Sequence, residues 1–241
     1  MCFHVNPKTS EITAEQHYKK LAIKNKIKEN TLFHLSAFEY PELSILKMNQ
    51  DKDLHFEPMY WGLIPQWAKS FQSFSRMNTI NARIETLNSK SSFKHFINTQ
   101  RAILTVSGFY EWQHVGKEKI PFYIFPKDNS LWSLACLYDE FIDKDTGETY
   151  PSFSILTKEA IEPIATIHNS KKRMPLILKE QHFEDWLSID YQFKELNATK
   201  MSISENEIDY YPISANPKTK DSNNIWIEKK TMDKSLQIQL F

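Results

Sequence analysis

The sequence predicts a single α+β domain in which strands outnumber helices and pair mainly antiparallel. Short apolar segments between residues 102 and 157 follow one another directly, with turns rather than helices between them. This order favours antiparallel pairing over a βαβ sheet. The 241 residues are 41% hydrophobic, and no linker-like segment divides them, so one sizeable core is expected.

The expected elements follow from hydrophobic periodicity and turn residues. Residues 10–28 form a first amphipathic helix, with Ser10 as its N-cap. Residues 143–147 form a hairpin turn, in which Gly147 supplies a positive φ. The polar composition beyond Ala215 indicates a domain over residues 1–214 and a tail over 215–241. Strands are expected at 56–64, 102–106, 109–113, 121–125, 131–138, 153–157 and 174–178, and further short helices at 89–99, 158–166 and 179–188.

Composition excludes several function classes. The 4 glycines form no dinucleotide fingerprint or P-loop, and there is no H-E-x-x-H motif. The 2 cysteines cannot build a four-thiolate zinc site. The 30 Lys and Arg residues balance 30 Asp and Glu residues, which argues against a uniformly basic coat. No apolar run reaches membrane-spanning length and no signal peptide is recognised, so a cytoplasmic protein without metal or cofactor is expected.

Cys2 is the first candidate for chemistry, because removal of Met1 makes it the N-terminal residue. Its amine would have a reference pKa of about 7.7–8.0 and its thiol one of about 8.5. The amine can form a Schiff base with an aldehyde, and the thiolate can then close on the imine carbon to give a thiazolidine. The alternative interpretation is accidental placement. Cys136 lies in an apolar run and is expected to be a buried structural thiol.

Two further segments place polar groups where they suit catalysis or binding. If residues 81–85 are extended, Asn81, Arg83 and Glu85 share one face. Glu111 lies between aromatic residues at the end of a predicted strand, surroundings that raise a carboxyl pKa and suit a proton donor. Taken alone, Glu111 would more often be an exposed or salt-bridged acid.

Aromatic and basic residues mark two more segments. Trp61 and Trp67 flank a Gly and a Pro, although such tryptophans are more often core residues than ligand platforms. His168 ends a predicted helix, and the basic residues 171–173 follow it. The ordinary interpretation of that cluster is a solvated loop.

Together these segments resemble the SOS-response-associated peptidase (SRAP) family over nearly the whole chain. The order and spacing of the segments carry the resemblance. They are Met1-Cys2, Trp61–Ala68, Asn81–Thr86, Ser92-Phe93, Arg101, Val106–Trp112, Pro121–Tyr123, Phe153–Thr157, Ile167-His168, Arg173–Leu178 and Tyr211–Ser214.

The resemblance implies an α+β domain with a β-barrel-like antiparallel core, flanking helices and a groove for single-stranded DNA. It implies that the N-terminal Cys traps the ring-opened aldehyde of an abasic site as a thiazolidine. This lyase-like DNA-repair chemistry, part of the SOS response to DNA damage, would follow autocatalytic removal of Met1 by a cysteine-dependent peptidase activity.

The resemblance also implies roles for individual residues. Cys2 would be the nucleophile, and Asn81 would hold its amine. Glu111 would assist Met1 removal and proton transfer, and His168 would act as general acid–base on ring opening, Schiff-base formation and reversal of the crosslink. Arg83 would contact a phosphate beside the lesion. DNA-binding residues are further expected at Trp67, Thr157, Lys171, Lys172 and Arg173.

The chain departs from the family pattern at three places. Phe3 and His4 stand where the family has Gly-Arg, which removes one expected phosphate contact. Residues 34–38 replace the usual Asn-Val-Ala-Pro loop of the DNA groove. The connection from His168 to Arg173 is longer and adds the charges of Lys171 and Lys172, which are predicted to strengthen DNA binding and its salt dependence.

The last residues suggest a protein partner. Gln237–Phe241 resembles the Q-x-x-L-F peptide with which bacterial proteins bind the replication sliding clamp, and a flexible apolar end suits insertion into a groove. The alternative is that these residues pack as a terminal strand. The family resemblance implies a monomer, associated with the nucleoid in a bacterium.

Two other functions remain open from sequence. Cys2 with an acid and an amide partner could attack carbonyls of other substrates, as in an N-terminal-nucleophile peptidase or amidohydrolase. Alternatively, Cys2 is inert and the protein is a non-covalent module that binds single-stranded DNA or a protein, an interpretation to which Phe3 and His4 lend support.

Overall fold

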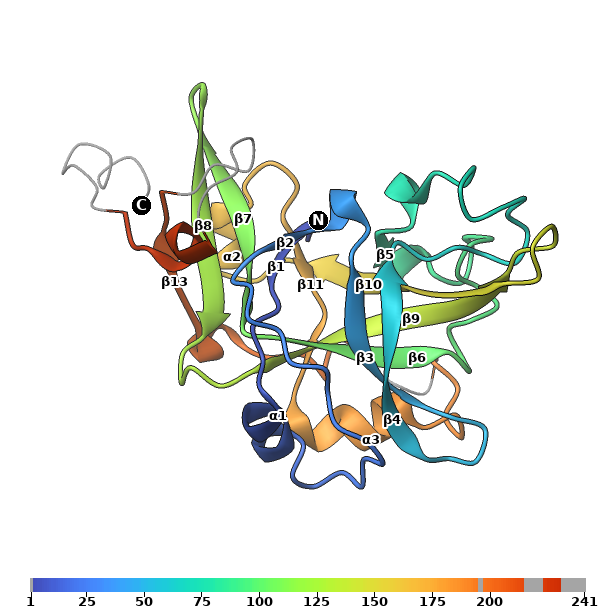
Figure 1. Cartoon of the computed structure of the whole chain (residues 1–241). Helices are drawn as coiled ribbons and strands as arrows, with labels where there is room; N and C mark the ends of the chain where they lie inside the picture. The colour runs from blue at the N-terminus through green and yellow to red at the C-terminus, as the bar shows by residue number, and fades with distance from the viewer. Residues whose placement is uncertain (1, 195–196, 215–222, 231–241) are drawn as a thin grey trace.

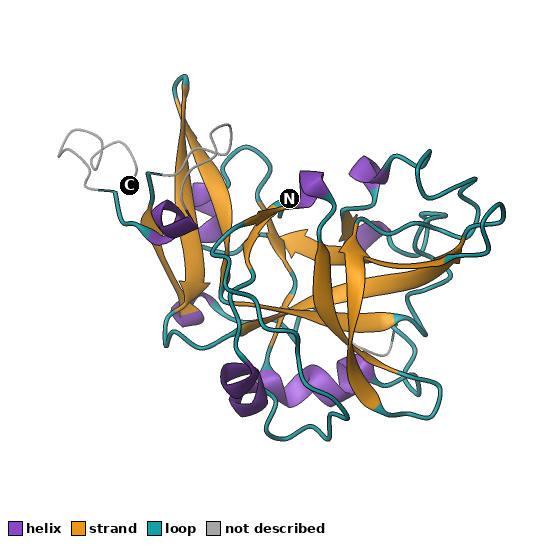
Figure 2. Ribbon diagram, in the orientation of Figure 1, coloured by secondary structure: helices purple, strands orange, loops and turns teal. Residues whose placement is uncertain are grey.

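Two β-sheets form the framework of the molecule (Figure 1). The N-terminal strand belongs to the smaller, five-stranded sheet. The computed structural model describes residues 2–194, 197–214 and 223–230. Strands dominate, and the helices are short and lie at the periphery (Figure 2). The predicted α+β class with a barrel-like core is confirmed.

One sheet closes into a five-stranded barrel. The closing pair of strands, β10 and β4, is parallel, as is the pair β10–β5, whereas antiparallel pairing was expected. A ring with an odd number of strands cannot alternate direction throughout, so one parallel pair is required. In order around the barrel the strands are β4 (Leu54–Trp61), β3 (Glu42–Met48), β6 (Arg101–Val106), β9 (Trp132–Ile142) and β10 (Thr149–Glu159); β5 (Asn81–Arg83) and β11 (Arg173–Pro175) pair with β10, and β12 (Ile177–Leu178) pairs with β9.

The second sheet is antiparallel and brings the N-terminus beside a strand from the middle of the chain. Gly108 allows this sheet to form, because a Cβ there would lie 2.5 Å from the Ile124 carbonyl oxygen and 2.6 Å from the Tyr123 ring. The glycine therefore sets how closely β7 approaches β8. The strand order is β13 (Ile208–Pro212), β8 (Glu118–Pro126), β7 (Gly108–Val115), β1 (His4–Asn6) and β2 (Leu35–Ser36).

Side chains on the barrel strands alternate between two cores. Inward residues such as Leu104 and Cys136 belong to a buried cluster that includes Cys2 and residues of the second sheet. Outward residues such as Ile103 and Leu137 pack with α1 (Glu11–His17) and α3 (Phe183–Leu187). Figure 1 shows these two helices side by side at the lower end of the barrel. Cys136 is a buried thiol, as expected.

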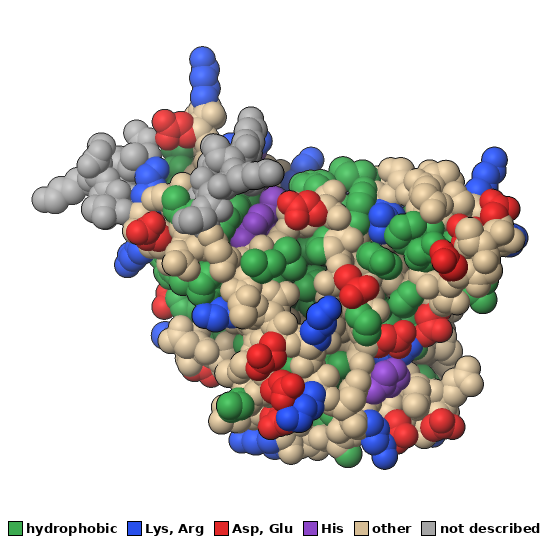
Figure 3. Space-filling view, in the orientation of Figure 1, with side chains coloured by type: hydrophobic (Ala, Val, Ile, Leu, Met, Phe, Trp, Pro, Cys, Tyr) green, Lys and Arg blue, Asp and Glu red, His purple; other side chains and the backbone are tan. Residues whose placement is uncertain are grey.

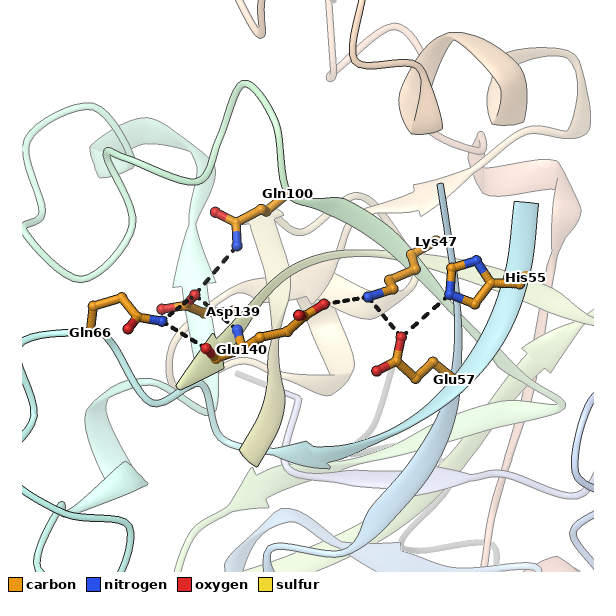
Figure 4. Close-up of polar contacts among 7 residues, drawn as sticks. All are labelled: Lys47, His55, Glu57, Gln66, Gln100, Asp139 and Glu140. Carbon is orange, nitrogen blue, oxygen red and sulfur yellow. Dashed lines mark hydrogen bonds and ion pairs between the residues drawn. The ribbon is translucent and has the colours of Figure 1, made fainter. Parts of the chain in front are cut away.

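Polar side chains of β3, β4 and β9 are joined in a chain of contacts that extends to Gln66 and Gln100 in the adjoining loops (Figure 4). The ammonium of Lys47 is buried and lies 2.7 Å from a Glu57 oxygen and 2.5 Å from a Glu140 oxygen. The neighbouring Asp139 is 2% exposed, and its Oδ1 accepts a hydrogen bond from Gln66 Nε2 at 2.9 Å. Two carboxylates on one ammonium compensate the cost of burying its charge.

The first helix begins where the sequence predicts but is shorter. Ser10 caps it, since its Oγ accepts a hydrogen bond from the Thr13 backbone nitrogen at 3.2 Å. The helix ends at His17 because the following chain turns to β4, where the Lys24 nitrogen donates to the first carbonyl of that strand at 2.8 Å. The remaining helical turns are α2 (Ile164–Ile167) and the 3₁₀ turns η1 (Ala37–Glu39), η2 (Arg76–Asn78), η3 (Ile84–Thr86), η4 (Glu180–His182), η5 (Glu205–Glu207) and η6 (Asn223–Ile227).

Other predicted elements differ in extent. Residues 89–99 form successive turns rather than a helix. The predicted helix 158–166 is wrong at its start, because β10 continues to Glu159 and Pro163 disfavours helix in the residue before it. The predicted strand 56–64 ends at Trp61, the strand 174–178 divides into β11 and β12, and the helix 179–188 appears as η4 followed by α3.

Part of the predicted tail is packed on the second sheet. Trp226 is 4% exposed, the Ile227 carbonyl accepts a hydrogen bond from the Tyr211 hydroxyl at 2.9 Å, and Lys229 bridges to Ile213. A domain boundary at residue 214 stays a prediction, and Gln237–Phe241 lies outside the described residues. Among the described residues, no helix is both long and apolar enough to span a membrane.

Candidate active site around the N-terminal cysteine

Cys2 lies just before β1, inside the junction of the two sheets. It is fully buried, and its carbonyl accepts a hydrogen bond from Asn81 Nδ2 at 2.9 Å. Its Sγ lies 3.9 Å from the His4 carbonyl oxygen. Burial, and then the negative charge of Glu111, raise the pKa of the thiol. The thiol is therefore protonated at neutral pH and needs a nearby proton acceptor to become a nucleophile.

Asn81 reaches Cys2 from β5, at the barrel side of the junction. β5 pairs with β10, so Asn81 lies opposite Ile155 and Arg83 opposite Thr157. Asn81 and Arg83 both lie in the extended strand, as predicted, but Glu85 does not share their face because the strand ends at Arg83 and Glu85 lies in η3. The Oδ1 of Asn81 is buried and accepts no hydrogen bond from the described residues. This oxygen is a vacant acceptor close to the Cys2 backbone.

Glu111 reaches the same place from β7. It is 5% exposed, and burial raises the pKa of its carboxyl from 4.5 to about 8. The carboxyl is therefore largely protonated at neutral pH. The raised carboxyl pKa that the sequence predicts for Glu111 is thus found.

His168 completes the group from the end of α2. Its Nδ1 lies 2.8 Å from the Arg173 carbonyl oxygen and 3.4 Å from Glu111 Oε1. A carbonyl only accepts hydrogen bonds, so Nδ1 carries the proton of the neutral ring and Nε2 carries the lone pair. Burial lowers the pKa of His168 to about 4. A neutral imidazole, with its lone pair on Nε2, therefore lies beside a neutral carboxyl, so the ring can accept a proton at Nε2 and the carboxyl can donate one.

Contacts outside this group hold His168 against β7. Asn169 Nδ2 donates to the His114 carbonyl at 2.9 Å, and the His114 nitrogen donates to Asn169 Oδ1 at 3.1 Å. Gln113 Nε2 donates to the Thr166 carbonyl at 3.4 Å. The sequence did not predict these hydrogen bonds between Asn169 and the His114 backbone. The Asn directly after His168 was their signal, since Asn commonly bonds backbone groups at helix ends.

Arg173 and Thr157 are buried beside the group rather than displayed on the surface. Arg173 binds both Glu85 oxygens, at 2.7 and 3.0 Å, and its Nη2 donates to the Thr157 carbonyl at 2.7 Å. The Thr157 hydroxyl donates to the Ala82 carbonyl at 3.3 Å. These contacts join β5, β10, β11 and η3 behind Asn81. The ion pair Arg173–Glu85 was missed from sequence.

The other predicted DNA-binding residues are exposed. Arg83, Lys171 and Lys172 reach solvent, and Trp67 is 59% exposed with its ring edge-to-face on Phe74 at 5.5 Å. Positive and negative side chains are interspersed on the face shown in Figure 3. Any contact with DNA on this face would depend on particular side chains rather than on a broad basic surface.

The residues that depart from the family pattern pack on one another. His4 Nδ1 lies 2.9 Å from His34 Nε2, and the His34 ring stacks on Trp226 at 3.4 Å and 3°. Phe3 stacks on Phe38 at 5.0 Å. Burial lowers the pKa of His4 to about 4 and that of His34 to about 3. Both rings are neutral at neutral pH, so His4 does not supply the charge of the missing Arg.

Comparison with known proteins decides the family. A family model described as SOS response associated peptidase (SRAP) matches residues 1–218. The chain belongs to this family. Within the described residues, no group of three or more His, Cys, Asp and Glu side chains could hold a metal ion.

Two proteins with similar sequences are named for one activity. The chain is 36% identical over 152 residues to the abasic site processing protein YoaM of Bacillus subtilis, covering 61% of this chain and 63% of YoaM. It is 30% identical over 162 residues to the abasic site processing protein YMR114C of Saccharomyces cerevisiae, covering 65% of this chain and 42% of that protein. Each match thus spans less than two thirds of the relative. A solved structure of a protein from Bacteroides thetaiotaomicron agrees with a TM-score of 0.82 at 32% identity, covering 95% of this chain and 100% of that one.

Proposed function

We propose that this protein captures abasic sites in single-stranded DNA by forming a thiazolidine through Cys2. One observation carries the proposal: Asn81, Glu111 and His168, from three separate elements, converge on the N-terminal strand. The names of the SRAP relatives support an abasic site as the substrate. The enzyme class that follows is a self-processing peptidase with abasic-site crosslinking activity.

Removal of Met1 is the first step. Hydrolysis of the Met1–Cys2 peptide bond consumes one water, releases methionine and frees the Cys2 amine. The Cys2 nitrogen is a poor leaving group unless it receives a proton as the peptide bond breaks. Glu111 is protonated at neutral pH because burial raises its pKa to about 8, so it is suited to supply that proton. The vacant Oδ1 of Asn81 is suited to accept a hydrogen bond from the amine once it is free.

Capture of the sugar follows in balanced steps. The amine adds to the aldehyde carbon to give a carbinolamine, which loses one water to form the imine. The sulfur of Cys2 then bonds to the imine carbon, while the thiol proton ends on the nitrogen, so the net loss is one water. Neutral His168 is suited to take a proton from the sugar hydroxyl during ring opening and to return it, with Glu111 as its partner at 3.4 Å.

Contacts to the DNA come from the exposed residues around this group. Arg83, Lys171 and Lys172 are suited to phosphates, and Trp67 to a base, because stacking on an exposed indole tolerates any base. Arg173 and Thr157 act indirectly, since Glu85 binds both terminal nitrogens of Arg173 and the Thr157 hydroxyl binds the Ala82 carbonyl. Their part is to position β5 and Arg83.

A denaturing gel tests the proposal. Full-length protein is mixed with single-stranded DNA carrying one abasic site, and removal of Met1 is checked by mass spectrometry. A heat-stable shifted band is expected for wild type and for Cys136→Ala, the matched control thiol, and no band for Cys2→Ala. Absence of the wild-type band after confirmed loss of Met1 would contradict covalent capture.

The buried thiol favours one alternative, a non-covalent DNA-binding module. The full burial of Cys2 and its raised thiol pKa are what an inert cysteine would also show. In that case Cys2→Ala binds DNA as wild type does and neither forms a band. The third candidate, an N-terminal-nucleophile amidohydrolase, would instead turn over a peptide or amide substrate in a Cys2-dependent way.

A partner at the C-terminus belongs to the same proposal. Gln237–Phe241 matches the clamp-binding pattern in sequence, and clamp binding would bring a monomeric sensor to replicating DNA in the nucleoid. Deletion of residues 237–241 is expected to abolish binding to the bacterial sliding clamp while leaving the abasic-site band intact. Unchanged clamp affinity would contradict this part.

A further inference from the structure

Arg76 carries a guanidinium that lies among aromatic rings on the rim of the barrel. Its Cζ is 4.0 Å from the ring centroid of Tyr40, 4.8 Å from that of Phe71 and 6.0 Å from that of Tyr60. These separations are typical of cation–π contacts. The rings therefore hold the guanidinium in one place rather than leaving it free on the surface.

No carboxylate accompanies this cation. Within the described residues Arg76 makes no ion pair, and its Nε and Nη1 are buried without a hydrogen-bond partner. Burial lowers the pKa of the group. Removing a charge from water without a counter-ion is unfavourable, and cation–π contacts offset only part of this cost. The remaining nitrogen, Nη2, is not among these buried atoms and is the edge on which an anion could bind.

The backbone around Arg76 is adapted to this position. Gly62 has φ +112°, and a Cβ there would lie 2.8 Å from the Arg76 Cβ. The Thr79 nitrogen donates to the Arg76 carbonyl at 2.9 Å, which closes the turn of η2. Because Gly62 and Thr79 shape the site, the aromatic packing of Arg76 is built into the fold.

Two short segments connect Arg76 to the candidate active site. The turn η2 ends two residues before Asn81, whose amide donates to the Cys2 carbonyl. Tyr40, on which the guanidinium stacks, lies two residues after Phe38, and Phe38 stacks on Phe3 beside Cys2. Figure 1 shows the turns at 37–39 and 76–78 at the same end of the molecule as the N-terminus. An anion on Arg76 would thus sit beside a ligand that reaches Cys2.

We propose that Arg76 binds a phosphate of the DNA strand that enters the active site, on the side of Tyr40 and Phe71. The inference rests on the proposed function and adds a residue to it. Because the rings already fix the Arg76 side chain, it loses little further conformational freedom when it binds a phosphate. Its charge-assisted hydrogen bond to a phosphate oxygen is therefore favoured. Met77, which is 50% exposed beside it, offers an apolar contact for the attached nucleoside.

The test measures the affinity of full-length variants for an undamaged single-stranded oligonucleotide across a range of salt. Arg76→Met keeps the apolar stem and removes the charge, whereas Arg76→Lys keeps the charge. Lys24→Met removes an exposed charge from the segment that follows α1 and serves as the matched control. Loss of one phosphate contact is expected to weaken binding about fivefold to tenfold and to reduce the salt slope by about 0.7. Arg76→Lys is expected to keep the slope, and Lys24→Met to match wild type.

Two results would overturn the inference. One is an Arg76→Met variant with wild-type affinity and slope. The other is an equal loss of affinity in both Arg76 variants, with lowered thermal stability and an unchanged slope, which would make Arg76 a packing residue. Wild-type crosslinking to an abasic site is measured in parallel. A wild-type band with an unchanged Arg76→Met slope contradicts only the Arg76 site, whereas no wild-type binding or band contradicts both proposals.

Discussion

At the scale of single residues, burial sets the protonation states that the proposed chemistry uses. Glu111 and His168 lie 3.4 Å apart, and burial makes both neutral at pH 7 by moving their pKa values in opposite directions, to about 8 and about 4. An exposed pair would instead form an ordinary ion pair. The same burial raises the pKa of the Cys2 thiol, so the sulfur is kept unreactive until a proton acceptor is engaged.

The raised pKa of Glu111 predicts how stability depends on pH. The carboxyl is protonated in the folded state up to pH of about 8, but only up to about 4.5 when unfolded. Its contribution is therefore complete below pH 4.5 and falls as pH rises through 8, by about 1.4 kcal/mol per unit. Glu111→Gln, which stays neutral, is expected to lose this fall in urea unfolding between pH 5 and 8, while Met1 removal slows by about 100-fold.

The exposed Glu118→Gln, at the start of the neighbouring strand, is the control for that measurement. It is expected to leave both the pH dependence and Met1 removal unchanged. A Glu111→Gln variant whose free energy of unfolding still falls with pH as in wild type would assign the dependence to another group, such as the buried Asp139, whose pKa burial also raises.

At the scale of elements, β7 controls the geometry of the site more than any other strand. It carries Glu111, pairs with β1 beside Cys2, and binds the α2 loop through His114. Its position between β1 and β8 depends on Gly108, where the Ile124 carbonyl leaves no room for a side chain. A small displacement at Gly108 would therefore move Glu111 relative to both Cys2 and His168.

Gly108→Ala is expected to separate β7 from β8 and to cost about 3 kcal/mol or more of unfolding free energy. Gly116→Ala is the matched control, because a Cβ there meets no atom within 4 Å and bears only the strain of φ +59°, about 1 kcal/mol. Chemical denaturation of both variants measures the difference. Equal losses of unfolding free energy in the two variants would show that β7 and β8 move apart around the added methyl group at no cost.

At the scale of the whole molecule, sequence could predict what is local and could not predict what joins distant segments. Ser10 as a cap and Gly147 in a hairpin follow from local chemistry, and Cys2 stands out by its position alone. The closing of the barrel depends on β10 meeting β4 in parallel, and the pair Arg173–Glu85 joins residues 88 positions apart. Neither leaves a periodic signal in the sequence. Only the family resemblance predicted that the site residues come together, because no local sequence pattern indicates it.

The C-terminal segment beyond the family match is part of the structure around the N-terminal strand. The family model ends at residue 218, yet Asn223 Oδ1 accepts a hydrogen bond from the Phe33 nitrogen at 2.6 Å, and Trp226 stacks on His34 at 3.4 Å. His34 in turn contacts His4, two residues from the nucleophile. The two ends of the chain are thus coupled through one stack of rings.

This coupling predicts the behaviour of Trp226 variants. Trp226→Ala is expected to lower the free energy of unfolding by about 3–5 kcal/mol, since it empties a buried site, and Trp226→Phe to lose less. Because burial holds the pKa of His34 at about 3, exposure of the ring in Trp226→Ala should raise that pKa towards 6.5, as measured by NMR titration of the imidazole. The Nε2 of the protonated ring can only donate, so the contact would persist only with His4 Nδ1 as its acceptor. A His34 pKa that stays near 3 in Trp226→Ala would mean that the barrel and β2, rather than the C-terminal segment, keep water from the residues beside Cys2.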